Sequence, residues 1–123
     1  MAADPDPRSF LPLSPIVFQV LLALADGPRH GYGIIQEIDS RTNGLMRLRT
    51  GTLYLLLRRL SAEALVEATR TPRAEAVAAG HAPGSPRRYF DVTTLGRAVL
   101  SAEARRLQAA VADARAKRVL SKA

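Results

Sequence analysis

Hydrophobic and polar positions follow a helical period in four segments of the chain and a strand-like pattern in two short ones. The first helical segment starts at Ser14-Pro15, an N-cap residue followed by a proline at the first helical position. Its apolar run from Ile16 to Ala25 ends before Asp26-Gly27-Pro28. Because this run is apolar nearly all round, we expect the helix to be covered on two sides.

A second helix is predicted from Gly31, where Ile34, Ile35 and Ile38 recur at helical spacing. Asn43-Gly44 is a typical C-cap for it. Residues 45–49 alternate weakly, which predicts a small strand or an extended link.

The clearest helical pattern follows, with Thr50 at the position where an N-cap is needed. Four leucines share the spacing of one apolar helix face: Leu53, Leu56, Leu57 and Leu60. The opposite side carries Gly51, Tyr54, Leu55 and Arg58, with Thr52 and Arg59 on its flank. A helix surface that faces water usually mixes charges, so this face without acidic residues suggests an anionic partner, although neighbouring arginines are commonly just solvated.

Residues 65–70 and 87–92 favour β-structure and predict the two strands of a hairpin. The sixteen residues 71–86 between them are rich in Pro, Gly and Ala, so we expect a mobile tip. Residues 1–13 contain three prolines and no apolar period, which predicts a flexible N-terminal tail whose end Phe10 and Leu11 can tether.

Thr93 caps a predicted long helix from about Thr94 toward Lys117. One of its apolar stripes consists of Leu95, Ala98, Val99 and Ala102. The other consists of Leu100, Ala104, Leu107, Val111 and Ala114. The first stripe can pack on its own domain, whereas nothing in so short a chain is left to cover the second. We therefore expect a homodimer built by this helix, the alternative being a half-exposed helix that frays.

Composition adds a strong positive charge to this picture. The 123 residues fit one domain and carry a net charge of +7. Nine basic and four acidic residues give +5 over residues 45–97, and residues 98–123 carry +4. Such an excess points to nucleic acid or an anionic lipid surface. Sixteen of the eighteen cations are arginines, whose planar side chain binds phosphates or guanine edges through two hydrogen bonds.

Other classes of function find little support in the sequence. The chain has no Cys and two His, so we expect no metal site, no cofactor and no catalytic residues. His81, Ser85 and Asp91 lie close in sequence, but a mobile loop cannot hold a nucleophile and a base in register. His30 is expected to be a turn or capping residue. Neither a membrane-spanning run nor a secretion leader is recognisable, which predicts a cytoplasmic protein without a membrane partner.

The order of elements is that of a mostly α-helical winged helix-turn-helix with a small β-hairpin and an added C-terminal dimerisation helix. The domains would be the tail 1–13, a DNA-binding domain 14–92 with its wing at 65–92, and the dimerisation helix 93–123. The motifs His30-Gly31-Tyr32, Gly51-Thr52-Leu53-Tyr54 before Arg58-Arg59-Leu60, and Arg87-Arg88-Tyr89-Phe90 before Gly96 resemble those of the PadR family of bacterial transcriptional regulators. Departures are Leu55 in place of a common Pro, Ala64 in place of a Gly, and a longer wing.

In such a fold the third helix enters the major groove with its N-terminus near a phosphate. Arginines of the wing would meet the neighbouring backbone or the minor groove. The expected DNA-binding residues are Thr50, Thr52, Tyr54, Arg58, Arg59, Arg70, Arg73, Arg87 and Arg88.

The resemblance implies a homodimeric repressor that binds double-stranded DNA at an inverted repeat and is released by a small, often aromatic, effector. The chain lacks Trp, so a pocket that holds flat drugs with Trp cannot be carried over. The alternatives are a winged-helix module that binds protein or RNA without responding to an effector, and a basic amphipathic protein on an anionic membrane surface.

Overall fold

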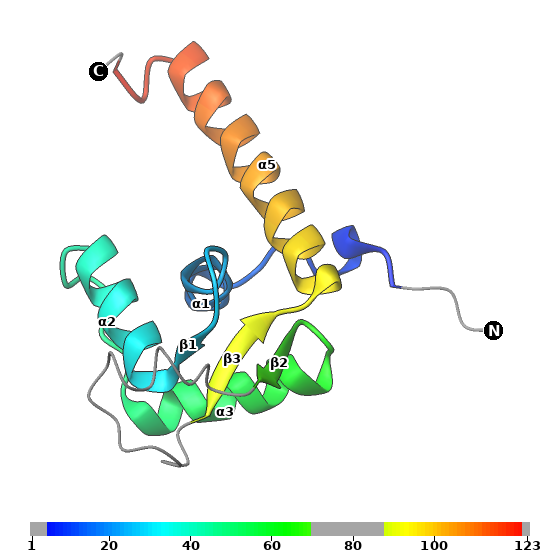
Figure 1. Cartoon of the computed structure of the whole chain (residues 1–123). Helices are drawn as coiled ribbons and strands as arrows, with labels where there is room; N and C mark the ends of the chain where they lie inside the picture. The colour runs from blue at the N-terminus through cyan, green and yellow to red at the C-terminus, as the bar shows by residue number, and fades with distance from the viewer. Residues whose placement is uncertain (1–4, 70–87, 122–123) are drawn as a thin grey trace.

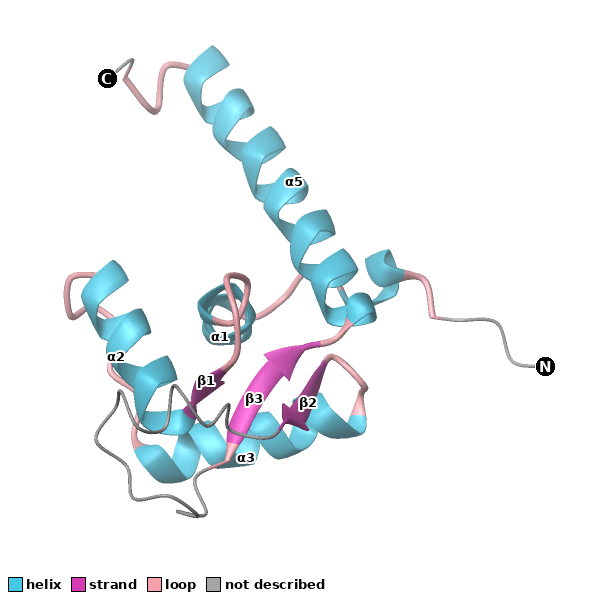
Figure 2. Cartoon of the chain, in the orientation of Figure 1, coloured by secondary structure: helices cyan, strands magenta, loops and turns pink. Residues whose placement is uncertain are grey.

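The computed structural model describes residues 5–69 and 88–121. Its elements are η1 (Pro7–Phe10), α1 (Pro15–Ala23), β1 (Arg29–His30), α2 (Gly31–Arg41), α3 (Thr50–Ala62), β2 (Val66–Thr69), β3 (Tyr89–Val92) and α5 (Thr94–Ala116). The first turns of α5 lie beside η1, α1 and the end of β3, α2 lies on the other side of α1, and the remainder of α5 projects away from them (Figure 1). The predicted class, mostly α-helical with a small amount of β-structure, is confirmed (Figure 2).

The sheet has three antiparallel strands in the order β1-β3-β2, one strand more than the hairpin that the sequence predicts. Val66 pairs with Val92 across the hairpin, and Arg29 pairs with Phe90 on the other side of β3. Strand β1 has two residues, too few for a recognisable alternation, and its pairing partner lies about sixty residues away in sequence. The predicted mobile tip at 71–86 lies outside the described residues.

Side-chain caps confirm three of the predicted helix starts. The Ser14 hydroxyl accepts from Val17 N at 3.3 Å, and the Thr93 hydroxyl accepts from Gly96 N at 2.9 Å. His30 Nδ1 accepts from Gly33 N at 3.0 Å, so His30 is the capping residue that we expected.

The cap predicted at Thr50 is wrong. Arg49 is the N-cap of α3, and it makes no side-chain capping bond. Its carbonyl accepts from Leu53 N at 3.0 Å, so the helix starts one residue earlier than expected and Thr50 is already in its first turn. Residues 45–49 form a link without a strand.

The hydrophobic core joins one face of each helix to the inner side of the sheet. Leu53, Leu57 and Leu60 of α3 are buried there, as their spacing predicts. Leu100 also belongs to this core, with 6% of its surface exposed. The expected free stripe of α5 therefore begins after Leu100, because the turn of the helix next to the sheet is covered by its own chain.

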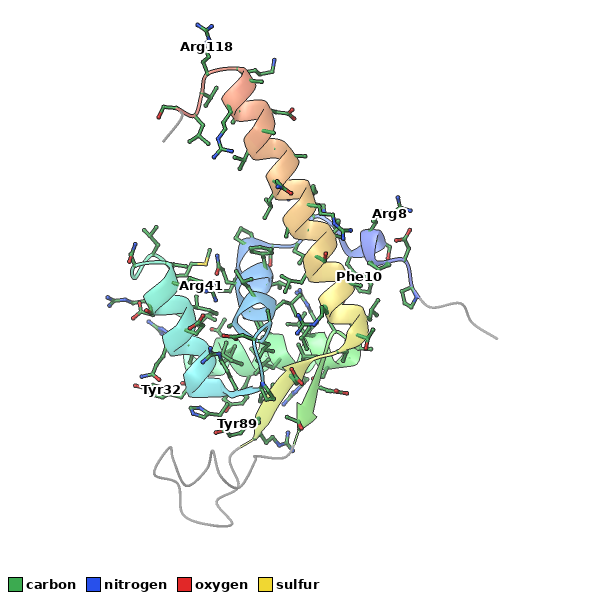
Figure 3. The ribbon with its side chains drawn as sticks, turned by 45° about the horizontal axis from the view of Figure 1, so that its top comes forward. Arg8, Phe10, Tyr32, Arg41, Tyr89 and Arg118 are labelled. Atoms are coloured by element: carbon green, nitrogen blue, oxygen red, sulfur yellow. The ribbon has the colours of Figure 1, made fainter. Side chains whose placement is uncertain are left out.

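Residues 5–14, directly before α1, lie against the rest of the domain, which confirms that the end of the predicted tail is tethered. Helix η1 packs against α5, and Figure 3 shows Phe10 beside the base of that helix. Phe10, Leu11 and Leu13 pack on the core, and Leu13 N donates to Glu103 Oε2 at 2.8 Å. The anchoring by Phe10 and Leu11 is the tether that the sequence predicts, whereas the bond from Leu13 to Glu103 joins residues 90 positions apart, which local sequence cannot reveal.

Glu103 is a buried carboxylate that ties this segment to the long helix. Besides Leu13 N, its oxygens accept from the guanidinium of Arg106, with Nη2 at 3.1 Å from Oε2. The hydrogen bond from Arg106 lowers the pKa of the Glu103 carboxyl, burial opposes this by raising it, and the Leu13 N–H lowers it again. Glu103 is thus charged at neutral pH, with a folded-state pKa below its ordinary value.

We expect Glu103→Gln to lower the free energy of unfolding at pH 7 by about 1–3 kcal/mol, because the charged hydrogen bonds weaken. A carboxyl whose pKa is lowered on folding stabilises the protein above its unfolded pKa of about 4.3, and this stabilisation is lost as the pH falls through the folded-state value. The variant should therefore lose less stability than the parent below about pH 5. Urea titrations followed by circular dichroism between pH 3 and pH 7 measure this.

Glu63→Gln is the matched control for this experiment, because the Glu63 carboxylate is exposed and makes one surface ion pair with Arg59. This substitution should change neither the free energy of unfolding at pH 7 nor the stability lost at acidic pH by much. If the parent and the Glu103 variant lost the same free energy of unfolding as the pH falls, that result would contradict the role given to this carboxylate.

Candidate nucleic-acid interface

The outward face of α3 remains open to solvent. Tyr54 is 43% exposed and Leu55 is 67% exposed. Arg58 and Arg59 are exposed one turn later. Helix α3 lies at the end of the molecule away from the far end of α5 (Figure 1). The helix has no acidic residue between Thr50 and Ala62, so the surface it presents is positive.

A groove of about 490 Å³ separates α3 from the strands of the wing. Its lining consists of Tyr54, Leu57, Arg58, Ser61, Val66, Glu67, Ala68, Arg88 and Phe90. The fold thus brings together three of the expected DNA-binding residues, Tyr54, Arg58 and Arg88. Glu67 is the acidic residue of this lining.

Tyr54 is held between two elements that are distant in sequence. Its ring meets that of Phe90 edge-on, with centroids 6.2 Å apart and planes at 63°. Its hydroxyl lies against Gly31, where a Cβ would come within 2.6 Å of the oxygen. Since Gly31 has no side chain, it leaves the space that Tyr54 occupies. Tyr54 is therefore part packing residue and part exposed, with a fixed orientation.

The two arginines of α3 differ in their partners. Arg59 Nε lies 3.5 Å from Glu63 Oε1, one helical turn away. Among residues 5–69 and 88–121 no carboxylate pairs with Arg58. Arg58 is thus the cation of α3 that is free to bind an external anion, and Arg59 is partly neutralised.

The N-terminus of α3 is exposed from Arg49 through Thr52 and has no side-chain cap. The amides of a first helical turn lack partners within the helix, and the helix dipole adds positive potential there. Thr50 and Thr52 therefore flank a surface suited to phosphate. Arg49 was not among the expected residues, although its position directly before the helix was a readable signal.

Other expected residues are only partly placed. Arg88 is exposed at the start of β3, whereas Arg70, Arg73 and Arg87 lie outside the described residues. Tyr32, which belongs to the first motif of the PadR resemblance, is exposed at the start of α2 and does not line the groove between α3 and the wing.

The far half of α5 carries apolar surface that its own chain does not cover. Leu107 and Val111 are 37% and 38% exposed, and Ala104 is exposed beside them while Ala114 is half-buried. Arg118 lies beyond the far end of the helix, well away from the core (Figure 3). Between α5 and η1 runs an open groove of about 700 Å³.

Residues 5–69 and 88–121 contain no cluster of three or more side chains suited to hold a metal ion. None of their helices combines the length and the apolar character needed to cross a membrane.

Comparison with known proteins gives the chain its family. The profile of the transcriptional regulator PadR-like family matches residues 20–102. The chain belongs to this family. A protein of Lysinibacillus sphaericus described as uncharacterized protein X is 33% identical over 82 residues, which are 67% of this chain and 68% of that protein. The PadR-like family is one of transcriptional regulators.

Solved structures of PadR-like and related regulators share the fold. A PadR family regulator of Clostridium difficile superposes with a TM-score of 0.65 at 20% identity, over 83% of this chain and 96% of that one. A transcriptional regulator of Clostridium thermocellum gives 0.63 at 16% identity, over 98% and 100%. Bacillus subtilis PadR, solved in complex with operator DNA, gives 0.59 at 17% identity, over 73% of this chain and 46% of that one.

The motifs that carried the PadR resemblance are contact points in this structure. Gly31 of the first motif meets Tyr54 of the second. A Cβ at Gly96 would lie 2.0 Å from the carbonyl oxygen of Leu65, so this glycine lets α5 approach the wing closely. The PadR-like sequence pattern thus marks the places where α2 meets α3 and where α5 meets the wing.

Proposed function

We propose that this PadR-like protein is a homodimeric repressor that binds an inverted-repeat operator in the cytoplasm. The observation that carries the proposal is the groove between α3 and the wing, which Arg58 and Arg88 line together with Tyr54, whose ring packs edge-on against Phe90. A helix that reads the major groove needs a buried stripe for anchorage and an outward face of polar and cationic groups. Helix α3 has both.

In this proposal α3 lies in the major groove. Thr50 and Thr52 bind a phosphate or base edges at the helix N-terminus, Tyr54 binds a phosphate or a base, and Arg58 binds a phosphate or a guanine edge. Arginines of the wing bind the neighbouring backbone or the minor groove, which sets register. The wing arginines are Arg70, Arg73, Arg87 and Arg88. Arg59 adds a contact to DNA from the flank of α3.

The dimer supplies the second reading helix. Leu107 and Val111, with Ala104 and Ala114, form a partly exposed apolar stripe that a second α5 covers. Leu100 is left out of the interface because its own chain buries it. A two-fold dimer presents two α3 helices to half-sites about 34 Å apart, or one helical turn.

Release by a small aromatic effector is the remaining part of the proposal, and it comes from the family resemblance. The open groove beside η1 is lined by apolar side chains, among them Leu11, Ala98 and Ala102, and by charged ones, Asp6, Arg8, Arg105 and Arg106. It borders α5, so a molecule bound there can change how the dimer holds its two reading helices.

Selection of duplexes from a random pool tests the proposal. The full chain should select a pseudo-palindrome with half-sites about one helical turn apart and sediment at twice its 13.3 kDa. Leu107→Asp places a charge in the apolar stripe, so it should sediment as a monomer and select no repeat. Leu45→Asp is the control, because Leu45 is 89% exposed outside α5 and should leave both results unchanged. A monomeric parent, or stronger binding to single-stranded RNA than to duplex DNA, would overturn the proposal.

A further inference from the structure

An exposed leucine stands in the middle of the face that α3 presents. Leu53, Leu57 and Leu60 point into the core, and Leu55 lies on the opposite side, where two-thirds of its surface is open. An apolar side chain there contributes nothing to the core. Its position on the charged face indicates a contact with a partner outside the chain.

The surroundings of Leu55 leave it accessible to a partner. One turn earlier is Gly51, whose missing Cβ would meet nothing within 4 Å. Helical side chains incline toward the helix N-terminus, and on that side of Leu55 the Gly51 position leaves open space. Arg58 and Arg59, three and four residues further on, flank it with positive charge. The result is a small apolar patch beside two cations, with open space at Gly51 for close approach.

A DNA major groove offers one matching group. Its floor consists of hydrogen-bond donors and acceptors, apart from the C5-methyl group of thymine. The two arginines favour the approach of phosphates, and Gly51 allows the backbone to come near the bases. We infer that Leu55 contacts a thymine methyl group and so selects thymine at one position of each half-site. This inference rests on the proposed function.

The test compares thymine with deoxyuridine, which lacks the methyl group. The full chain selects its preferred duplex from a random pool, and that duplex is remade with deoxyuridine at each thymine in turn. At one position per half-site the parent should bind about four-fold more weakly, as expected for one methyl no longer buried. Leu55→Ala should bind the two duplexes equally at that position. Alanine suits an exposed helical site, so the variant should keep its fold.

Leu45→Ala is the matched control, because Leu45 is an exposed leucine outside α3 and its loss should leave the four-fold preference intact. The inference is overturned if the parent binds every deoxyuridine duplex as well as the thymine duplex, or if Leu55→Ala keeps the preference. Selective duplex binding without a methyl preference overturns this inference alone. Failure to select any duplex overturns the proposed function with it.

Discussion

Replacing Arg58 with alanine should weaken operator binding about ten-fold per half-site and about a hundred-fold for a dimer on both, since one phosphate or guanine contact contributes roughly 1–3 kcal/mol. The physical reason is that Arg58 lies at the groove between α3 and the wing, and within the described part of the chain no carboxylate neutralises it. Fluorescence anisotropy with the selected duplex, at several salt concentrations, measures the effect.

The salt dependence tells which contact Arg58 makes. If it binds a phosphate, the slope of log K against log salt should fall by about 0.9 for each half-site in the variant. If it binds guanine, the slope should stay and the preference for guanine at one position should relax.

Arg105→Ala removes the same charge from an exposed site on α5, distant from α3, and serves as the control. Equal losses of affinity in the two variants would show that Arg58 acts only through net charge. That result would contradict a direct contact.

Gly96→Ala should lower the free energy of unfolding by at least about 3 kcal/mol, at the upper end of what overpacking costs. The new Cβ would lie 2.0 Å from the Leu65 carbonyl oxygen and 2.8 Å from Val92 Cγ2. The Leu65 carbonyl cannot retreat freely, because it accepts from Thr93 N at 3.1 Å. Urea unfolding followed by helical circular dichroism measures the loss.

Gly51→Ala is the control for the same substitution within a helix. Open space surrounds the Gly51 position, so alanine should raise stability by about 0.5–1 kcal/mol through its better helix propensity. If Gly96→Ala were within about 1 kcal/mol of the parent, α5 and the wing would not be in the close contact described.

Much of the candidate site could be predicted because helical faces are a local property. The leucine spacing in α3 placed Tyr54, Leu55 and Arg58 on the outer side, where the structure has them. The ion pair of Arg59 with Glu63 could also be predicted from their i, i+4 spacing. This pair partly neutralises the charge of Arg59 and leaves that of Arg58. The contact of Tyr54 with Gly31 was not, because it joins residues more than twenty positions apart.

The sequence by itself determined where α1, α2 and α5 start, the start of α3 to within one residue, and which helix faces are apolar, because backbone period and capping depend on neighbouring residues. It also determined the positive charge of α3. Only the tertiary structure decided that Leu100 is buried while Leu107 is partly free, that Glu103 holds the backbone of Leu13, and that β1 joins the sheet. Burial and strand pairing depend on what lies across space from a residue, and a pattern along the chain does not contain that information.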